Sequence, residues 1–373
     1  MASVLGNIRI LDFSRVLAGP FATMLLADFG ATVTKVERPG SGDDTRAWGP
    51  PYDATGTATY YLSVNRNKDG LVLDLADPGD LERARELAAE ADVLVENFRP
   101  GLMDRLGLDW DALRERSPGL VYCSITGFGR GAGATLPGYD LLAQALGGLM
   151  SITGETDGPP QKAGVALVDV LSGLFATVGI LAALRHRDAT GEGQRVEVNL
   201  LSSLLAALVN QGSAYTAGGV VPTRIGNRHP SIAPYEPLRC ADGELVVAVG
   251  NDRQFAALCD ALGISEAAAD PRYATNAARV EHRDALRDLL ERRLAAQPAA
   301  AWAAALTAAR VPAGIVNDVA AAFALASRLG LDPIVELPRA DGTTVELTRN
   351  PIALSATPAS YRTAPPALSA SPR

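Results

Sequence analysis

The stretch from Asn7 to Pro39, NIRILDFSRVLAGPFATMLLADFGATVTKVERP, decides the fold of this chain. Residues 7–14 are a short, mostly apolar run of the kind that forms a buried strand. Pro20 stands where a helix begins and Gly30 where it ends, which predicts a helix over 19–30. A second strand-like run follows over 31–39. The stretch therefore predicts a β-α-β unit.

The same pattern is repeated further along the chain. Strand-like runs occupy 70–75, 92–98 and 120–129, and a helix is expected over 77–91, with Asp77 as its cap and Pro78 in its first turn. Strands that alternate with helices are typical of a parallel, doubly wound sheet. We therefore expect an α/β fold with a doubly wound, mostly parallel sheet in a Rossmann-like large domain.

The remaining sequence predicts the domain organisation. After residue 137 the chain becomes largely helical, and a further strand is expected over 194–200. A Gly-, Pro- and Arg-rich texture near residues 218–236 marks a boundary. We expect residues 1–218 in the large domain, 219–325 in a smaller α+β domain, and 326–373 to return to the large domain. The Pro-, Ser- and Ala-rich end of the chain is expected to be poorly ordered.

Composition excludes several classes of function. The net charge of −8 and the pI near 5.1 argue against nucleic acid as a partner. The three cysteines are far apart and the chain has only three histidines, so we expect no metal site. The beginning of the chain has no signal-peptide pattern, and together with the cysteine usage this leads us to expect a cytoplasmic protein.

One charged residue stands in an apolar segment. Between Lys162 and Arg185 only Asp169 is charged, among Val, Leu, Ala and Gly. The segment is long enough to span a bilayer, but an Asp within a span is expensive, and we expect no membrane association. Taken alone, Asp169 is best explained as a carboxylate in the first turn of a helix. A nucleophile is the other interpretation.

Arginines follow the predicted strands. Arg38 comes after the second strand, and Arg99 and Arg105 follow the strand over 92–98. Ligands of doubly wound sheets bind at this edge, and guanidinium groups suit phosphates. The run GFGRGA at 127–132 fits a relaxed dinucleotide fingerprint, but no helix opens there, which counts against a nicotinamide enzyme. The three arginines together favour a phosphate-bearing ligand.

Five stretches in order carry a family resemblance: 10–46 with its ERPGSGDDTR end, ADVLVENFRPG, GYDLLAQALGGLMSITG, GVALVDVLSG and GQRVEVNLLSSLL. Over roughly residues 6–355 the chain resembles the class III (CaiB/BaiF) CoA-transferases. The resemblance implies a transferase that moves coenzyme A from an acyl-CoA, with succinyl-CoA as one candidate, to a small carboxylic acid. It implies that the CoA thioester is a substrate and that no cofactor is permanently bound. It further implies an interlocked homodimer.

The resemblance also assigns residues. Asp169 matches the Asp that attacks the thioester, forming an anhydride and then an aspartyl-CoA thioester. The matching CoA-binding positions are Val16, Leu17, Arg38, Leu73, Asp74, Asn97, Phe98, Arg105, Pro137, Gly138, Tyr139 and Asp140. Developing negative charge on the carbonyl oxygens needs donors, for which we expect backbone N–H groups near Gly138 and Tyr139 or around Asp169.

The family also contains α-methylacyl-CoA racemases, which are the alternative interpretation. They resemble this chain at Asp169 but have a His where Tyr139 stands here. Racemisation needs two groups that exchange a proton with Cα near neutral pH, and a Tyr with a pKa near 10 is a poor base. A non-catalytic CoA-binding protein is disfavoured because Asp169 is intact.

Two departures from the family pattern bear on substrate choice and assembly. Formyl-CoA transferases carry a glycine-rich loop where this chain reads GNRHPSIAPYE, residues 226–236, which counts against formyl and oxalate chemistry. In this setting His229 is a candidate contact of the acceptor acid, and Arg46 and Arg228 are candidates for its distal carboxylate. At the end of the chain, ALSASPR replaces the usual LGEHT, a change expected to affect dimer locking or stability.

Overall fold

The computed structural model of the protein describes residues 3–368. The chain forms two compact units. The first contains the residues up to Met150, Lys162–Val221 and the residues from Leu331 on; the second contains Ser151–Gln161 and Pro222–Gly330. The sequence predicts domain boundaries after residues 218 and 325, and the second unit covers 222–330. The second unit also contains the short segment 151–161, which the sequence prediction places in the large domain.

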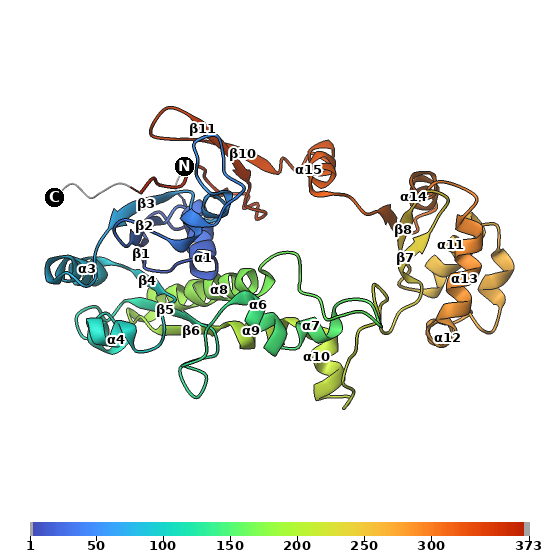
Figure 1. The fold of residues 1–373 in the computed structure, drawn as a ribbon, viewed down its shortest axis with the longest axis horizontal. Coiled ribbons are helices and arrows are strands. Elements are labelled where there is room, and N and C mark those ends of the chain that lie inside the picture. The colour runs from blue at the N-terminus through green and yellow to red at the C-terminus, as the bar shows by residue number, and fades with distance from the viewer. Residues whose placement is uncertain (1–2, 369–373) are drawn as a thin grey trace. The chain divides into compact units, whose positions relative to one another are not determined.

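A six-stranded parallel sheet organises the first unit (Figure 1). Its strands are β1 (Arg9–Asp12), β2 (Thr32–Glu37), β3 (Lys68–Val72), β4 (Val93–Glu96), β5 (Val121–Thr126) and β6 (Arg195–Asn199). Their order is β3-β2-β1-β4-β5-β6. The order reverses between β1 and β4, and ligands of such sheets bind beyond the carboxyl ends of the strands at that point.

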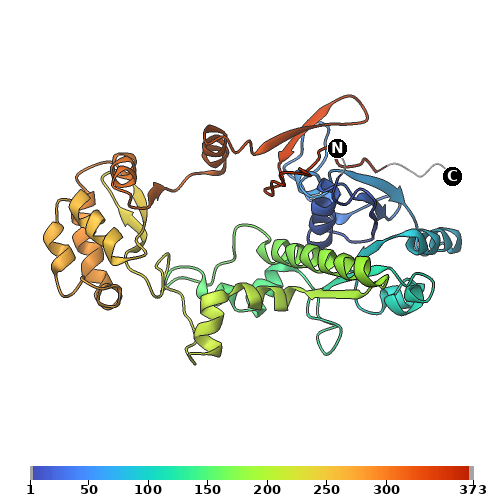
Figure 2. The ribbon, with the colours of Figure 1, turned by 180° about the vertical axis from the view of Figure 1, so that it is seen from behind.

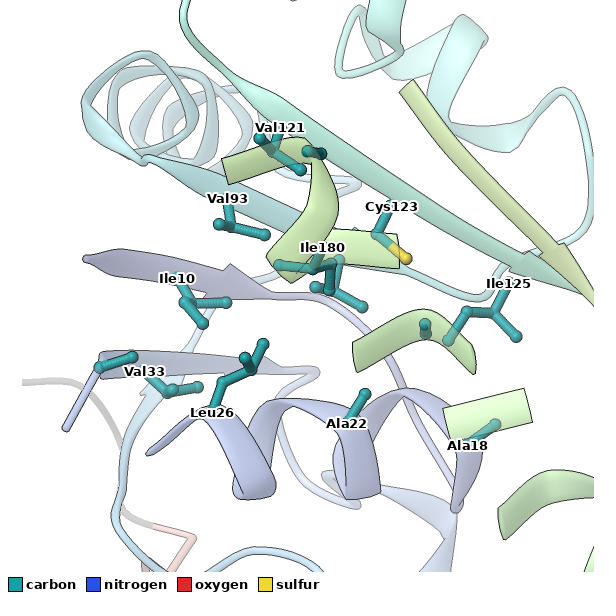
Figure 3. Close-up of a cluster of buried hydrophobic side chains, with 14 of the residues drawn as sticks. Ile10, Ala18, Ala22, Leu26, Val33, Val93, Val121, Cys123, Ile125 and Ile180 are labelled. Atoms are coloured by element: carbon teal, nitrogen blue, oxygen red, sulfur yellow. The ribbon is translucent and has the colours of Figure 1, made fainter. Parts of the chain in front are cut away.

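Helices cover both faces of this sheet, each over its own core. On one face lie α1 (Ala18–Asp28) and α8 (Leu167–Thr190), whose apolar side chains pack on strand residues such as Ile10, Val93 and Cys123 (Figure 3). On the other face lie α3 (Pro78–Glu90), α4 (Leu102–Leu106) and α5 (Trp110–Arg114). The Asp77 side chain accepts the N–H groups of Gly79 and Asp80, as its predicted role of cap requires.

Shorter helices complete the first unit. They are α2 (Thr59–Leu62), α6 (Asp140–Leu146), α7 (Leu149–Ile152), α9 (Leu200–Ala207), α10 (Val209–Thr216) and a 3₁₀ turn over Asp44–Ala47. Of these, α6 has a direct effect on the site described below, because it begins beside the amino end of α8.

Helix α8 is long and apolar enough to cross a membrane. Within the part of the chain that the structure describes, no other helix of that length is as apolar. One of its faces is buried in the core, through residues that include Val168, Ala176 and Ile180. Through this face the helix packs on the sheet of the first unit.

The second unit has its own sheet and core. Strands β7 (Tyr235–Arg239), β8 (Glu244–Ala248) and β9 (Ala313–Ile315) are antiparallel. Its helices are α11 (Asp252–Ala261), α12 (Asn276–Glu281), α13 (Arg283–Leu294), α14 (Ala299–Ala308) and α15 (Val319–Arg328), with a 3₁₀ turn over Ser265–Ala269. Phe255, Leu290 and Trp302 are among the side chains of its core.

The end of the chain returns to the first unit through a hairpin of β10 (Ile334–Pro338) and β11 (Thr344–Thr348) (Figure 2). The expectation of a poorly ordered end is wrong for residues 360–366, which other parts of the first unit hold by hydrogen bonds. Ser360 N–H donates to the Asp28 carbonyl at 2.8 Å, and Asn67 bonds the backbone of Arg362 and Thr363. Composition could not show these partners, which lie far away in sequence. The last part of the ALSASPR departure, residues 369–373, lies outside the described residues.

Candidate active site

An open cavity lies where β1, β4 and β5 end, the place that the strand order predicts. It encloses about 990 Å³ of empty space, including its mouth. Its wall comes from the residues that follow these three strands, together with Asp44, Asp169 and Leu200: Arg15–Ala18, Asn97–Pro100, Ile125–Gly129, Gly133, Ala134 and Leu136–Tyr139. All of these residues belong to the first unit.

Asp169 lies in the first turn of α8, which begins at Leu167. The residue is half-buried, and no hydrogen bond to its side chain is present among the described residues. Burial, with a second contribution from the charge of Asp140, raises its pKa to about 7. A carboxylate that is partly desolvated and left without donors is more nucleophilic than one in water.

Asp140 supports this arrangement from the start of α6. Its Oδ1 accepts the N–H of Val168 at 2.7 Å and that of Asp169 at 3.2 Å. Gln144 holds the other oxygen at 2.6 Å and accepts the N–H of Ala163 at 2.8 Å. Asp140 therefore caps α8 in place of Asp169, and the nucleophile candidate keeps its own oxygens free.

The Asp140 cap bears on which of the two expected sets of backbone amides can donate to an oxyanion. The N–H of Asp169 already donates to Asp140, so it is not available as the donor expected around Asp169. The N–H groups of Gly138 and Tyr139 lie on the cavity wall, and neither has a hydrogen-bond acceptor within the described residues. The alternative location that we expected, near Gly138 and Tyr139, is therefore the one the geometry favours.

The structure brings together nine of the residues predicted from the sequence: Arg99, which follows the strand over 92–98, and eight that the family resemblance assigned. Val16, Leu17, Asn97, Phe98, Pro137, Gly138, Tyr139 and Asp169 all line the cavity. Asn97 also bonds Arg15 in both directions, at 2.8 Å to its N–H and 2.7 Å from its carbonyl. The side-chain amide of Asn97 therefore holds the backbone of Arg15 in place on the cavity wall.

Five predicted CoA-binding residues do not line this cavity. Asp140 is the cap just described; Leu73 is buried in the core under α3. Arg38 pairs with Asp44 and bonds Ser41, while Asp74 accepts the N–H of Ala76 and Arg105 is exposed on α4. Arg38, Asp74 and Arg105 are exposed, whereas Leu73 is not, and for all five positions the CoA contact stays a prediction.

Arg46 does not have the free guanidinium that an acceptor-binding residue needs. Two of its nitrogens each lie 2.7 Å from an oxygen of buried Glu37, and it also donates to the Tyr61 hydroxyl and the Pro366 carbonyl. The guanidinium stacks on the Tyr61 ring, 3.7 Å from its centre. These contacts tie β2 to the end of the chain and favour a structural role for Arg46.

Arg228 and His229 belong to the second unit. Arg228 pairs with Asp284 at 2.9 Å and approaches Glu236 at 3.5 Å. The His229 ring packs against Tyr235, and its Nδ1 accepts the N–H of Ser231. Their predicted contact with an acceptor acid stays a prediction.

Sequence reasoning missed Tyr60 and Arg15. Burial, with further contributions from the charges of Asp169, Asp140 and Asp43, raises the pKa of Tyr60 to about 12, so its hydroxyl stays protonated. Its ring meets Trp48 edge-on at 5.3 Å. Arg15 lies over the Phe98 ring on the cavity wall. Tyr60 and Tyr61 are adjacent, and no local signal in the sequence distinguishes the fully buried Tyr61 from the half-buried Tyr60.

Comparison with known proteins identifies what such a site belongs to. The family model described as CoA-transferase family III matches residues 5–371. A succinate–glutarate CoA-transferase of Agrobacterium fabrum is 45% identical over 98% of this chain and 92% of its own length. An acetyl-CoA:oxalate CoA-transferase of Acetobacter aceti is 44% identical over 85% of this chain and 81% of its own length.

A solved structure agrees in fold over nearly the whole chain. The crystal structure of a CAIB/BAIF family protein from Brucella suis has a TM-score of 0.87 and 42% identity, and the match covers 99% of this chain and 97% of that one. The resemblance that the sequence motifs indicated is therefore confirmed.

Proposed function

The chain belongs to CoA-transferase family III, and from this premise we propose that Asp169 is the nucleophile that carries coenzyme A from an acyl-CoA to a small carboxylic acid. The chain is an enzyme of the CoA-transferase class. The observation that carries the assignment is the half-buried Asp169 carboxylate, which faces the cavity without a hydrogen bond among the described residues, while Asp140 takes the helix cap.

The reaction proceeds by four acyl exchanges. The Asp169 carboxylate attacks the thioester carbonyl, the C–S bond breaks, and an aspartyl anhydride and CoA thiolate form. The thiolate attacks the aspartyl carbonyl, which releases the first acid and leaves an aspartyl-CoA thioester. The incoming carboxylate then displaces the thiolate as a second anhydride. The thiolate finally attacks the acyl carbonyl of that anhydride, which frees Asp169 and the new acyl-CoA.

Donors on the cavity wall support the charged intermediates. Negative charge develops on a carbonyl oxygen at each attack, and preorganised N–H or O–H groups stabilise it. The N–H groups of Gly138 and Tyr139 on that wall are the candidates. The thiolate that leaves and returns stays bound, so the anhydrides are consumed before water reaches them.

The relatives narrow the substrates. Proteins that are 42–45% identical are named for succinyl-CoA or succinate with glutarate or mesaconate, and for acetyl-CoA with oxalate. We take succinyl-CoA as the first donor to test and short dicarboxylic acids as acceptors. The loop over 226–236 is weak evidence against oxalate, because a relative at 44% identity is named for that acid.

The racemase alternative lacks a second acid–base group at the position where the family's racemases have a His. That position is Tyr139, which lines the cavity and is 63% exposed. A phenol is a much poorer general base for a Cα proton than an imidazole. The relatives named above are transferases, which agrees with this interpretation.

A homodimer is part of the proposal. Leu174, Phe175, Val178 and Leu181 form an exposed apolar stripe on α8, opposite its buried face. Residues at this spacing share one face of a helix, and exposed apolar stripes mark interaction surfaces. A second copy of this chain is the occupant that the family resemblance implies.

We also propose that the protein acts in the cytoplasm.

Trapping of the covalent intermediate tests the nucleophile. Wild-type protein, Asp169→Ala and Asp188→Ala are incubated with succinyl-CoA, with and without hydroxylamine, and intact and peptide masses are measured. Asp188 supplies the matched control, because it is an exposed carboxylate further along α8. We expect a CoA adduct or hydroxamate on Asp169 in wild type and in Asp188→Ala, and none in Asp169→Ala. An adduct on another residue, or none with succinyl- or acetyl-CoA, contradicts the proposal.

A further inference from the structure

The loop between β1 and α1 holds an unusual backbone conformation on the cavity wall. Val16 has a φ of +69°, in the left-handed region that β-branched residues rarely adopt. It is followed by Leu17 and Ala18, the cap and first residue of α1, and all three line the cavity. Strain of this kind persists only where the surroundings over-determine it, and it clusters at functional sites.

Three side chains hold three consecutive residues of this loop. The Ser14 carbonyl accepts the Lys35 ammonium at 2.9 Å. Arg15 is bonded through both backbone groups by Asn97. The Val16 N–H lies 3.3 Å from each carboxylate oxygen of Asp43. The strained residue is thus held through its own amide.

Asp43 and Lys35 are paired at 2.9 Å, and both side chains are fully buried. Asp43 is further fixed by Thr45, whose N–H and hydroxyl donate to it at 3.0 and 2.7 Å. An ion pair this deep is costly to desolvate and is weak evidence for stability alone. The pair contacts the loop at Ser14 and at the strained Val16, so a role in holding that loop is the better explanation.

The loop sets where α1 begins relative to Asp169. A Cβ on Gly173 of α8 would lie 2.6 Å from the Ala18 carbonyl, so the start of α1 touches α8 there. Asp169 precedes Gly173 by four residues and shares its helix face. The N–H groups of Leu17 and Ala18 have no acceptor among the described residues, and their placement depends on the conformation of Val16.

We propose that Asp43, held by Lys35, is a positioning residue that keeps Val16 in its left-handed conformation and so aligns the cavity wall and the start of α1 with Asp169. The role rests on the proposed function of Asp169. It makes a specific prediction: Asp43 matters because residue 16 is a Val. A glycine at position 16 adopts positive φ without steric cost, so its conformation depends less on the hydrogen bonds from its N–H to Asp43.

The test is a double-mutant cycle on kcat/KM. We expect Asp43→Ala to lower kcat/KM by about 10- to 100-fold, the scale of a misplacement of about 1 Å, with the larger part in kcat. In the Val16→Gly background the same change should cost less than about fivefold. Asp43→Asn, which keeps an oxygen for the Val16 N–H, should lie between wild type and Asp43→Ala. Equal fold losses in the Val and Gly backgrounds would overturn the proposal.

Asp28→Ala is the matched control, since Asp28 is also buried, pairs with Arg66 and lies at the other end of α1. It should lower Tm as Asp43→Ala does but keep kcat/KM within about threefold at temperatures where it is folded. If Asp43→Ala fails to fold, Lys35→Met/Asp43→Ala replaces it, because it leaves no unpaired buried charge. If the wild-type protein forms no trapped adduct on Asp169, the proposed function is contradicted. If the wild-type protein forms the adduct and the kcat/KM of Asp43→Ala equals that of Asp28→Ala, only this inference is contradicted.

Discussion

The Asp140 carboxylate accepts the backbone N–H of Asp169 at 3.2 Å, so one acidic residue caps the helix on which the other, the proposed nucleophile, lies. The two residues are 29 positions apart. Because Asp140 occupies the amide, Asp169 does not fold back onto its own helix and faces the cavity. The charge of Asp140 also adds to the effect of burial in raising the pKa of Asp169 to about 7.

The first prediction concerns the pH dependence of the transfer. The proposed mechanism requires Asp169 in its carboxylate form, so kcat/KM should rise with pH and level off above about pH 7. Asp140→Asn removes the neighbouring charge and keeps an oxygen for the N–H groups, so the midpoint should move to lower pH. The measurement is kcat/KM from about pH 5 to about pH 9 for both proteins. A midpoint unchanged in Asp140→Asn would assign the titration to another group.

The second prediction concerns stability. The pKa of Asp169 is higher in the folded than in the unfolded chain, so the stabilising neutral form is lost as pH rises through about 7. Asp169→Asn cannot ionise and should be more stable than wild type at about pH 8, by about 1–3 kcal/mol, since each pKa unit is worth about 1.4 kcal/mol and water reaches part of the cavity. Near pH 4 the difference should vanish. Urea unfolding at both pH values measures it, and a gain that is the same at both would refute the explanation.

The third prediction separates structural from substrate-binding arginines. Arg46→Met leaves the buried Glu37 carboxylate without its partner and should cost about 3–5 kcal/mol of unfolding free energy. The KM for the acceptor acid should not change in the protein that remains folded. Arg38→Met breaks an exposed pair with Asp44 and should cost less than about 1 kcal/mol. An Arg46→Met variant of normal stability with a raised KM for the acceptor acid would contradict the structural role and support the acceptor-binding role predicted from the sequence.

The fourth prediction concerns the end of the chain. A chain that ends at Ser355 loses the bonds that residues 360–366 make to Asp28, Asn67 and Arg46, and it should be strongly destabilised or fail to fold. Tyr361→Phe tests the same contact gently, because only the hydroxyl that accepts the Asn350 N–H is removed. We expect that change to cost about 1 kcal/mol. Thermal melts of both variants give the answer, and a truncated chain that melts like wild type would show that the segment is dispensable.

The fifth prediction concerns assembly. Val178 is 64% exposed on the apolar stripe of α8, and Val178→Asp should convert a dimer to a monomer. Val319→Asp is the control, because Val319 is an equally apolar residue, 75% exposed, on α15 of the second unit. Light scattering at equal concentrations measures the masses. A wild-type chain that is monomeric would contradict the homodimer itself.

Local pattern was sufficient for much of the fold. The runs that became β1, β2 and β4, and the helices between them, have apolar spacing and end signals that lie within a few residues of one another. The isolated charge of Asp169 in an apolar segment likewise marked the candidate nucleophile. Both features depend on neighbours in sequence, which a single chain displays directly.

Contacts between distant residues were a different matter. Arg46 appeared to be free for a ligand because nothing near it in sequence showed that Glu37 and Pro366 would surround it. The end of the chain looked poorly ordered because its composition does not reveal Asn67 or Asp28 as partners.

By itself, then, the sequence determined the alternation of strands and helices, the family and the one carboxylate that stands in an apolar segment. Only the tertiary structure decided that Asp140 would cap α8, that Asp43 would hold Val16, and which side chains remain free to meet a substrate. The physical reason is that apolar periodicity is a local property of the chain. The partner of a hydrogen bond or a buried charge is fixed only when elements far apart in sequence close on one another.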